Sequence, residues 1–167
     1  MRIIDFTGQE NIRSEGHTSK GDQPKWKQAG NWYKADHMGY EALSEIIVSR
    51  LLAWSDADDF VSYQPVRIHY NGKVVSGCSS RDFMRKGEML IPFERLHRAY
   101  EGRGLAQTLT RLDSPTARIA YTVDFVERVT NLTGVGAYLT AILELDCLTL
   151  NEDRHTNNLA VLKSEAK

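Results

Sequence analysis

The stretch Asp153-Arg-His-Thr-Asn-Asn158 is the part of the sequence on which the fold assignment depends. Apolar residues recur before it at helical spacing: Tyr138, Ile142, Leu145 and Leu148. A short apolar run, Leu159 to Leu162, follows it and predicts a strand. A carboxylate and an amide five positions apart are thus expected in a polar turn between a helix and a strand. A solvated Asn/Asp-rich turn without function is the alternative, and the stretch taken alone leaves both readings open.

Phosphoryl transfer uses these two residue types. A carboxylate orients the attacking hydroxyl and accepts its proton, and oxygen ligands hold Mg²⁺ on the phosphates. Asp153 is therefore the candidate catalytic base, Asn158 the candidate Mg²⁺ ligand, and His155 is expected to brace the loop. The spacing of Asp and Asn is that of the protein-kinase catalytic loop, although there the His precedes the Asp.

The region before this stretch predicts further helices. Ser114-Pro115 supplies an N-cap and a first-turn proline. The helix after it has an apolar face formed by Ile119, Val123, Val126 and Val129. Gly134 and Gly136 separate it from the helix that leads to Asp153. An amphipathic stretch over 93–100 ends at Gly102 and Gly104, and 88–91 is a strand candidate.

The first half of the chain predicts mostly strands. Residues 66–70 and 73–76 flank Asn71-Gly72, a pair that tolerates positive φ at both turn positions, so they predict a hairpin. A helix is expected from about 39 to 54, on the apolar spacing of Tyr40, Leu43, Ile47, Val48, Leu51 and Trp54. Residues 32–35 predict a short strand. Residues 3–6 predict another, followed by a long flexible loop through Gly16, Gly21 and Gly30.

Lys34 lies in the short strand directly before this helix. A strand lysine has a fixed reach, so it can hold the α- and β-phosphates of a nucleotide when a helix glutamate pins it. Glu41 and Glu45 are four residues apart and share one helix face, so either can be that partner. A surface lysine with two solvated glutamates is the alternative.

Together these residues resemble the HipA-like serine/threonine kinase family. Asp-x-His-x-x-Asn followed by an apolar strand is similar to its catalytic loop, while Asp-Arg-His-x-x-Asn is also found in phosphatidylinositol 3- and 4-kinases. The run Ser44-Glu-Ile-Ile-Val-Ser-Arg-Leu-Leu resembles the family's helix and favours Glu45 over Glu41 as the partner of Lys34.

Thr18-Ser-Lys-Gly-Asp-Gln-Pro-Lys25 resembles the family's segment Ser-x-x-Gly-x-Gln-x-Lys. Gly21 lets the backbone approach phosphates closely, and Lys25 offsets their charge. The resemblance therefore implies nucleotide binding by Thr18, Ser19, Gly21, Lys25 and Lys34. In the family this loop contains an autophosphorylated serine, and Thr18 stands at its position with Ser19 beside it.

The resemblance covers roughly residues 18–162 and implies an α+β, protein-kinase-like fold. A β-rich N-lobe is expected over residues 1–92, and an incomplete helical C-lobe over 93–167. The expected cofactors are ATP and Mg²⁺, the expected catalytic residues are Asp153, Lys34 and Glu45, and the expected metal ligand is Asn158. A kinase also needs a second metal-binding acid soon after the catalytic loop, and the tail offers only Glu165.

The sequence is accordingly expected to be a fragment, inactive as an isolated chain, of an ATP-dependent Ser/Thr protein kinase. Expected partners are an unknown protein substrate and an antitoxin of a toxin–antitoxin pair or a complementing chain. A lipid or small-molecule kinase and a non-catalytic binding module with a kinase-like lobe remain alternatives.

Composition argues against some classes of function and location. The formal net charge of −1 gives no global basic field for direct nucleic-acid binding. No run of about 18 apolar residues occurs, so no membrane span is expected. Cys78 and Cys147 lack metal-type spacing and are expected to be buried thiols, which favours a cytoplasmic location.

Overall fold

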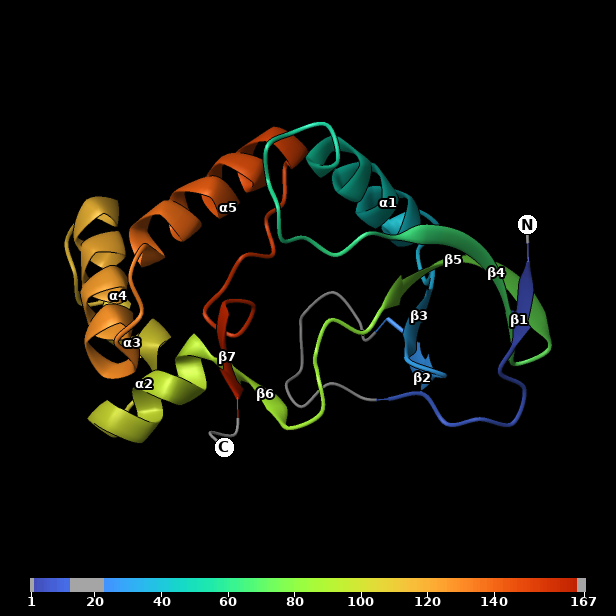
Figure 1. Ribbon diagram of the computed structural model, residues 1–167, viewed down its shortest axis with the longest axis horizontal. Helices are drawn as coiled ribbons and strands as arrows, with labels where there is room; N and C mark the ends of the chain where they lie inside the picture. The colour runs from blue at the N-terminus through green and yellow to red at the C-terminus, as the bar shows by residue number, and fades with distance from the viewer. Residues whose placement is uncertain (1, 13–22, 165–167) are drawn as a thin grey trace. The chain divides into compact units, whose positions relative to one another are not determined.

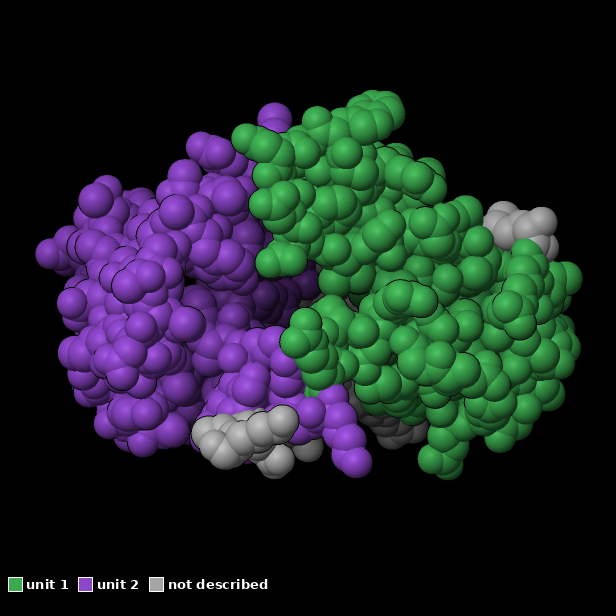
Figure 2. Space-filling view, in the orientation of Figure 1, with its two compact units in different colours: residues 1–85 green, residues 86–167 purple. Residues whose placement is uncertain are grey.

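The computed structural model describes residues 2–12 and 23–164, and the chain forms two compact units, residues 1–85 and 86–167 (Figures 1 and 2). Each unit contains both helices and strands, so the expected α+β class is confirmed. The strand over residues 88–92, placed with the first part in the sequence analysis, lies in the second unit.

The described residues of the first unit, 2–12 and 23–85, form five strands and one helix. They are β1 (Ile3–Asp5), β2 (Lys25–Gln28), β3 (Asn31–Ala35), α1 (Glu41–Leu52), β4 (Gln64–Tyr70) and β5 (Lys73–Arg81). The strands form one sheet in the order β1-β4-β5-β3-β2. β1 runs parallel to β4 and the other neighbours are antiparallel.

Two hairpins with two-residue turns build most of this sheet. Asn71 and Gly72 connect β4 to β5 with φ of 49° and 71°, so the hairpin expected there is confirmed. Ala29 and Gly30 connect β2 to β3 in the same way, with φ of 50° and 75°. The expectation of one long loop up to residue 31 is therefore wrong for residues 25–28, because the turn allows β2 to pair with β3.

The core of the first unit lies on one face of the sheet. It comprises Ile4, Phe6, Trp26, Ala35, Val66 and Ile68. The ring of Phe6 stacks on that of Trp26 at 4.7 Å between centroids. α1 packs against β4 and β5 (Figure 1). The expected helix is present, and it buries Ala42 and Ser49 rather than its large apolar residues.

In the second unit, residues 86–164 form four helices and a two-stranded ribbon. They are β6 (Glu88–Pro92), α2 (Phe93–Glu101), α3 (Leu105–Leu109), α4 (Pro115–Thr130), α5 (Val135–Thr149) and β7 (Ala160–Ser164). β6 and β7 pair antiparallel. The cap expected at Ser114 is confirmed, since its hydroxyl accepts a hydrogen bond from the N–H of Ala117 at 3.1 Å. Gly102 ends α2 in the left-handed conformation, and the short α3 was not expected.

The core of the second unit comprises Phe93, Leu96, Leu105, Phe125, Val126, Val135 and Leu139. The buried face of α4 is centred on Phe125 and Val126, so Ile119 of the predicted face is exposed. On α5, Tyr138 and Leu148, two of the apolar residues on which the helix was predicted, are likewise exposed. Cys147 is also exposed, against expectation, because it lies off the buried face of α5, whereas Cys78 is buried.

None of the helices in residues 2–12 and 23–164 combines the length and apolar composition needed to cross a bilayer.

Candidate functional site

Lys34 on β3 is held by a glutamate of α1. Its ammonium donates to both carboxylate oxygens of Glu45, at 2.7 and 2.9 Å, and lies 3.2 Å from the hydroxyl of Tyr63. Glu41, the other candidate, instead accepts hydrogen bonds from the backbone N–H groups that precede α1, beginning with Met38 at 2.8 Å. Of the two glutamates, only Glu45 therefore pins the strand lysine.

The electrostatics of this cluster keep Lys34 charged. Burial acts to lower the pKa of Lys34, but the charge of Glu45 and the hydrogen bonds that Lys34 donates to Glu45 and Tyr63 outweigh it, and the pKa rises above its ordinary value. Burial, followed by the nearby charge of Glu45, raises the pKa of Cys78 to about 12. The neutral thiol lies 3.8 Å from Oε2 of Glu45.

Polar contacts at both ends of α1 fix the position of Glu45. The buried Asp36, just after β3, accepts a hydrogen bond from the N–H of Ala42 at 2.6 Å in the first turn. Near the other end, the hydroxyl of Ser49 accepts from the N–H of Tyr63 at 3.2 Å. The helix is therefore tied to β3 and to the segment before β4. These contacts hold the backbone of Glu45 next to Lys34.

Lys25 lies directly across from Lys34. The two residues are register partners in the β2–β3 pair, and residues opposite each other in a ladder point to the same face. This places two lysines side by side on the sheet. The other residues assigned to the glycine loop, Thr18, Ser19 and Gly21, lie outside the described residues.

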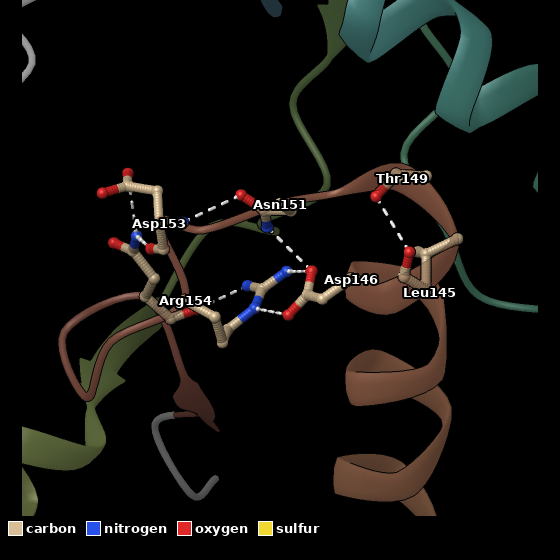
Figure 3. A network of polar contacts seen from close by, with 7 residues as sticks. Leu145, Asp146, Thr149, Asn151, Asp153 and Arg154 are labelled. Carbon is tan, nitrogen blue, oxygen red and sulfur yellow. Dashed lines mark hydrogen bonds and ion pairs between the residues drawn. The ribbon is translucent and has the colours of Figure 1, made fainter.

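The loop after α5 is anchored by a buried carboxylate of that helix. Figure 3 shows Arg154 reaching back to Asp146, with Nε 2.7 Å from Oδ2 and Nη2 2.9 Å from Oδ1. The side-chain amide of Asn151 donates to the same carboxylate at 2.7 Å. The hydrogen bond from Arg154 is the main reason that the pKa of Asp146 is lowered, since burial opposes it.

Asp153 and Asn158 face each other across this loop. The side-chain amide nitrogen of Asn158 donates to the backbone carbonyl of Asp153 at 2.7 Å and lies 3.5 Å from its carboxylate. This bond commits the amide nitrogen to the loop and leaves the amide oxygen as the group that can bind a cation. Asp153 is exposed. His155 braces the turn, because its Nδ1 accepts from the N–H of Asn157 at 3.3 Å.

A second anchor ties the loop to α2. Oε2 of Glu94 accepts from the hydroxyl of Thr156 at 2.8 Å and from the N–H of Ala106, the second residue of α3, at 2.9 Å. The approach is close because residue 104 is glycine: a Cβ there would overlap Oε1 of Glu94. Glu94 thereby joins α2, α3 and the loop.

Several of these residues were not predicted from the sequence as part of a site. Tyr63, Asp146 and Glu94 belong to no motif, and their contacts depend on tertiary proximity. Asp146 had one detectable signal, since it is an acidic residue in a run of apolar residues eight positions before Arg154. A buried charge at such a position requires a partner.

The structure therefore brings the predicted residues together in two groups. Lys25, Lys34 and Glu45 lie in the first unit, and Asp153 and Asn158 lie in the second. Within residues 2–12 and 23–164, no three His, Cys, Asp or Glu side chains are grouped so that they could hold a metal ion. Comparison with known protein families, with curated proteins and with solved structures finds no match for this chain.

Proposed function

We propose that this chain is the nucleotide-handling part of an ATP-dependent phosphotransferase of the HipA-like Ser/Thr protein-kinase type. The observation that carries the proposal is the pair between Lys34 and Glu45, with the ammonium at 2.7 and 2.9 Å from the two carboxylate oxygens. A strand lysine held by a glutamate of the following helix is the arrangement with which protein kinases position the phosphates of ATP.

The surroundings of Lys34 suit a polyphosphate. The pKa of Lys34 is raised, chiefly by Glu45 acting against burial, so the side chain stays cationic over the physiological range. Lys25 adds a second cation on the same face of the sheet. Only about a quarter of the Lys34 side chain is exposed (26%), so its charge is less screened than that of a surface lysine.

The loop of the second unit supplies the residue types for the transfer step. The exposed carboxylate of Asp153 is suited to orient a substrate hydroxyl and accept its proton, and the amide oxygen of Asn158 is suited to bind Mg²⁺. Mg²⁺ bridges phosphate oxygens and offsets charge that develops on them. One amide oxygen is a sufficient protein contribution, because Mg²⁺ retains waters and takes further ligands from the phosphates.

Arg154 gives no support to the lipid-kinase alternative. Its guanidinium binds Asp146 through two nitrogens, and its third, Nη1, lies 3.4 Å from the backbone carbonyl of Asn158. A guanidinium occupied in this way holds the loop and does not recognise a lipid phosphate. The protein-kinase reading is therefore the better supported of the two.

Calorimetric titration of the whole chain with a non-hydrolysable ATP analogue and Mg²⁺ tests the proposal. We expect binding that Lys34→Met and Glu45→Gln each weaken at least about tenfold, equivalent to about 1.4 kcal/mol. Lys73→Met is the matched control, because Lys73 lies next to the β4–β5 turn and takes no part in the Lys34 cluster. Its affinity is expected to be that of the unaltered chain.

Two outcomes would reject the proposal. Absence of binding at millimolar analogue favours the non-catalytic module, and equal weakening by Lys73→Met shows a non-specific charge effect. The role of Asn158 as a Mg²⁺ ligand is tested separately. Asn158→Ala is accordingly expected to reduce the Mg²⁺ dependence of binding while leaving metal-free binding unchanged.

A further inference from the structure

α1 carries a row of large apolar side chains on its solvent side. Their exposed fractions are 55% for Tyr40, 57% for Leu43, 49% for Ile47, 46% for Leu51 and 87% for Trp54. Tyr40 is the N-cap and Trp54 lies just past the C-cap, so the row spans the whole helix. We call these five residues the α1 seam. Contiguous exposed apolar surface of this kind is typical of interaction sites.

The seam lies on the side of α1 opposite to Glu45, the partner of Lys34. At about 100° per residue, its helical members Leu43 and Leu51 lie about 40° to either side of Ile47, and Tyr40 and Trp54 flank the two ends of the helix. Ala42, Glu45 and Ser49 point about 140° to 160° away from the direction of Ile47, toward the sheet. A partner on the seam therefore leaves the pair of Glu45 and Lys34 uncovered.

The seam has the same pattern when read from either end. Leu43 and Leu51 lie four residues before and after Ile47, and the aromatic residues Tyr40 and Trp54 lie seven before and after it. A two-fold axis through Ile47, perpendicular to the helix, would superimpose leucine on leucine and aromatic on aromatic. Such self-complementarity is what an isologous interface between identical chains requires.

We propose that the α1 seam is the docking surface for α1 of a second copy of this chain, with the two helices antiparallel. Ile47 then meets Ile47 of the partner copy, and Leu43 meets Leu51 of the partner copy. Tyr40 packs against Trp54 of the partner copy. The apolar row of each copy is covered by the same row of the other.

Charge favours the antiparallel over the parallel pairing. The peptide dipoles of each helix sum to a partial positive charge at its N-terminus and a partial negative charge at its C-terminus, and in an antiparallel pair these opposite ends lie side by side. A parallel pair would align the two helix dipoles, which repel.

The association is expected to be weak, because one helix from each copy buries less than the area of a standard interface. A dissociation constant on the order of 100 μM is reasonable for such a contact. Sedimentation equilibrium of the whole chain up to about 1 mM should therefore show a monomer–dimer equilibrium. Ile47→Asp is expected to weaken it at least about tenfold, since it places two carboxylates at the two-fold axis.

Leu148→Asp is the matched control, because Leu148 is an exposed leucine on α5 outside the seam. It should leave the equilibrium unchanged. The proposal is wrong if the chain stays monomeric at all concentrations, if Ile47→Asp dimerises as before, or if Leu148→Asp weakens the dimer equally. Circular dichroism of each variant checks that it is folded; both substituted positions are exposed.

Oxidative cross-linking tests the orientation, in a Cys147→Ser background that leaves only the buried Cys78. Ile47→Cys should form a disulfide with itself across the axis. Leu43→Cys should not cross-link with itself but should do so when mixed with Leu51→Cys, because only then do the two thiols meet. Self-cross-linking of Leu43→Cys as efficient as that of the mixture would overturn the antiparallel arrangement. These readouts need no nucleotide, so they are independent of the proposed function.

Discussion

Arg154 donates two parallel hydrogen bonds, of 2.7 and 2.9 Å, to the carboxylate of Asp146, and this pair fixes the loop of Asp153 and Asn158 to the end of α5. Asp146 is buried, while the Arg154 side chain is 26% exposed. The bidentate geometry is the strongest form of such a pair, because both nitrogens of one guanidinium edge are used. The candidate loop is thus positioned by a residue outside its own sequence.

Removing either partner of this pair should destabilise the second unit. Asp146→Ala and Arg154→Ala are each expected to lower the free energy of unfolding by about 2 to 3 kcal/mol, because each leaves a charge-assisted hydrogen-bond partner unpaired. Urea unfolding followed by far-UV circular dichroism measures this loss. Tryptophan fluorescence is unsuitable, because all three tryptophans lie in residues 1–85 and report on the first unit.

The control for this experiment is Arg128→Ala, which removes an exposed ion pair with Glu101 of 3.2 Å and should cost less than about 1 kcal/mol. The double variant of Asp146 and Arg154 should cost less than the sum of the two single variants. Strict additivity would mean that the two side chains do not interact in solution.

The same carboxylate predicts an acid dependence of stability. The pKa of Asp146 is lowered in the folded chain, mainly by its hydrogen bond from Arg154, so the unfolded chain binds more protons at acid pH. Its contribution is therefore present above the ordinary aspartate pKa of about 4 and is lost as pH falls through the lower folded value. Asp146→Asn should flatten the fall of unfolding free energy below about pH 4. An unchanged profile would contradict this assignment.

Gly104→Ala tests the second anchor of the loop. The added Cβ would overlap Oε1 of Glu94 and push that side chain away from Thr156. We expect a loss of about 1 to 3 kcal/mol in unfolding free energy, typical of overpacking. Gly136→Ala is the matched control: its Cβ would meet Val123 at an ordinary 3.9 Å within a helix, so it should be neutral or stabilising.

A second change identifies the cause of the loss at Gly104. In a Glu94→Ala background the overlap is gone, so Gly104→Ala should add little further cost. An equal cost in both backgrounds would show that the backbone, and not Glu94, requires glycine at this position.

The two cysteines should differ sharply toward a thiol reagent. Burial, followed by the charge of Glu45, raises the pKa of Cys78 to about 12, so it stays protonated and covered at pH 8, whereas Cys147 is exposed. A disulfide reagent that releases a coloured thiolate should titrate one thiol in the folded chain and two after denaturation. Two fast-reacting thiols in the folded chain would contradict the buried position of Cys78.

Elements with strong local signals were predictable. Asn71-Gly72 specifies its hairpin because both residues tolerate positive φ, and Ser114-Pro115 specifies the start of α4 because cap and proline act within one turn. Chain order also predicted that a glutamate of the following helix holds Lys34, and the family resemblance favoured Glu45 over Glu41 for this role. The contact between Lys34 and Glu45 at 2.7 Å is now observed, while their roles in catalysis stay a prediction.

Burial was less predictable than secondary structure. The apolar spacing on α1 indicates a helix, and that helix is present, but most of the apolar residues that gave the spacing are exposed to solvent. Periodicity reports that one side of a helix is apolar and does not identify what covers that side. β2 was missed because its four residues, Lys25–Gln28, become a strand by pairing with β3.

Local chain order was thus enough to establish the helices with clear caps, the Asn-Gly hairpin and the polar loop from Asp153 to Asn158. These elements depend on backbone dihedral preferences and on contacts between residues close in sequence, so consecutive residues determine them. The partners Tyr63, Asp146 and Glu94 emerged from the folded arrangement alone. Their contacts join residues from 8 to 62 positions apart, and the free energy of such contacts depends on distance, burial and dielectric surroundings that exist once the chain has packed.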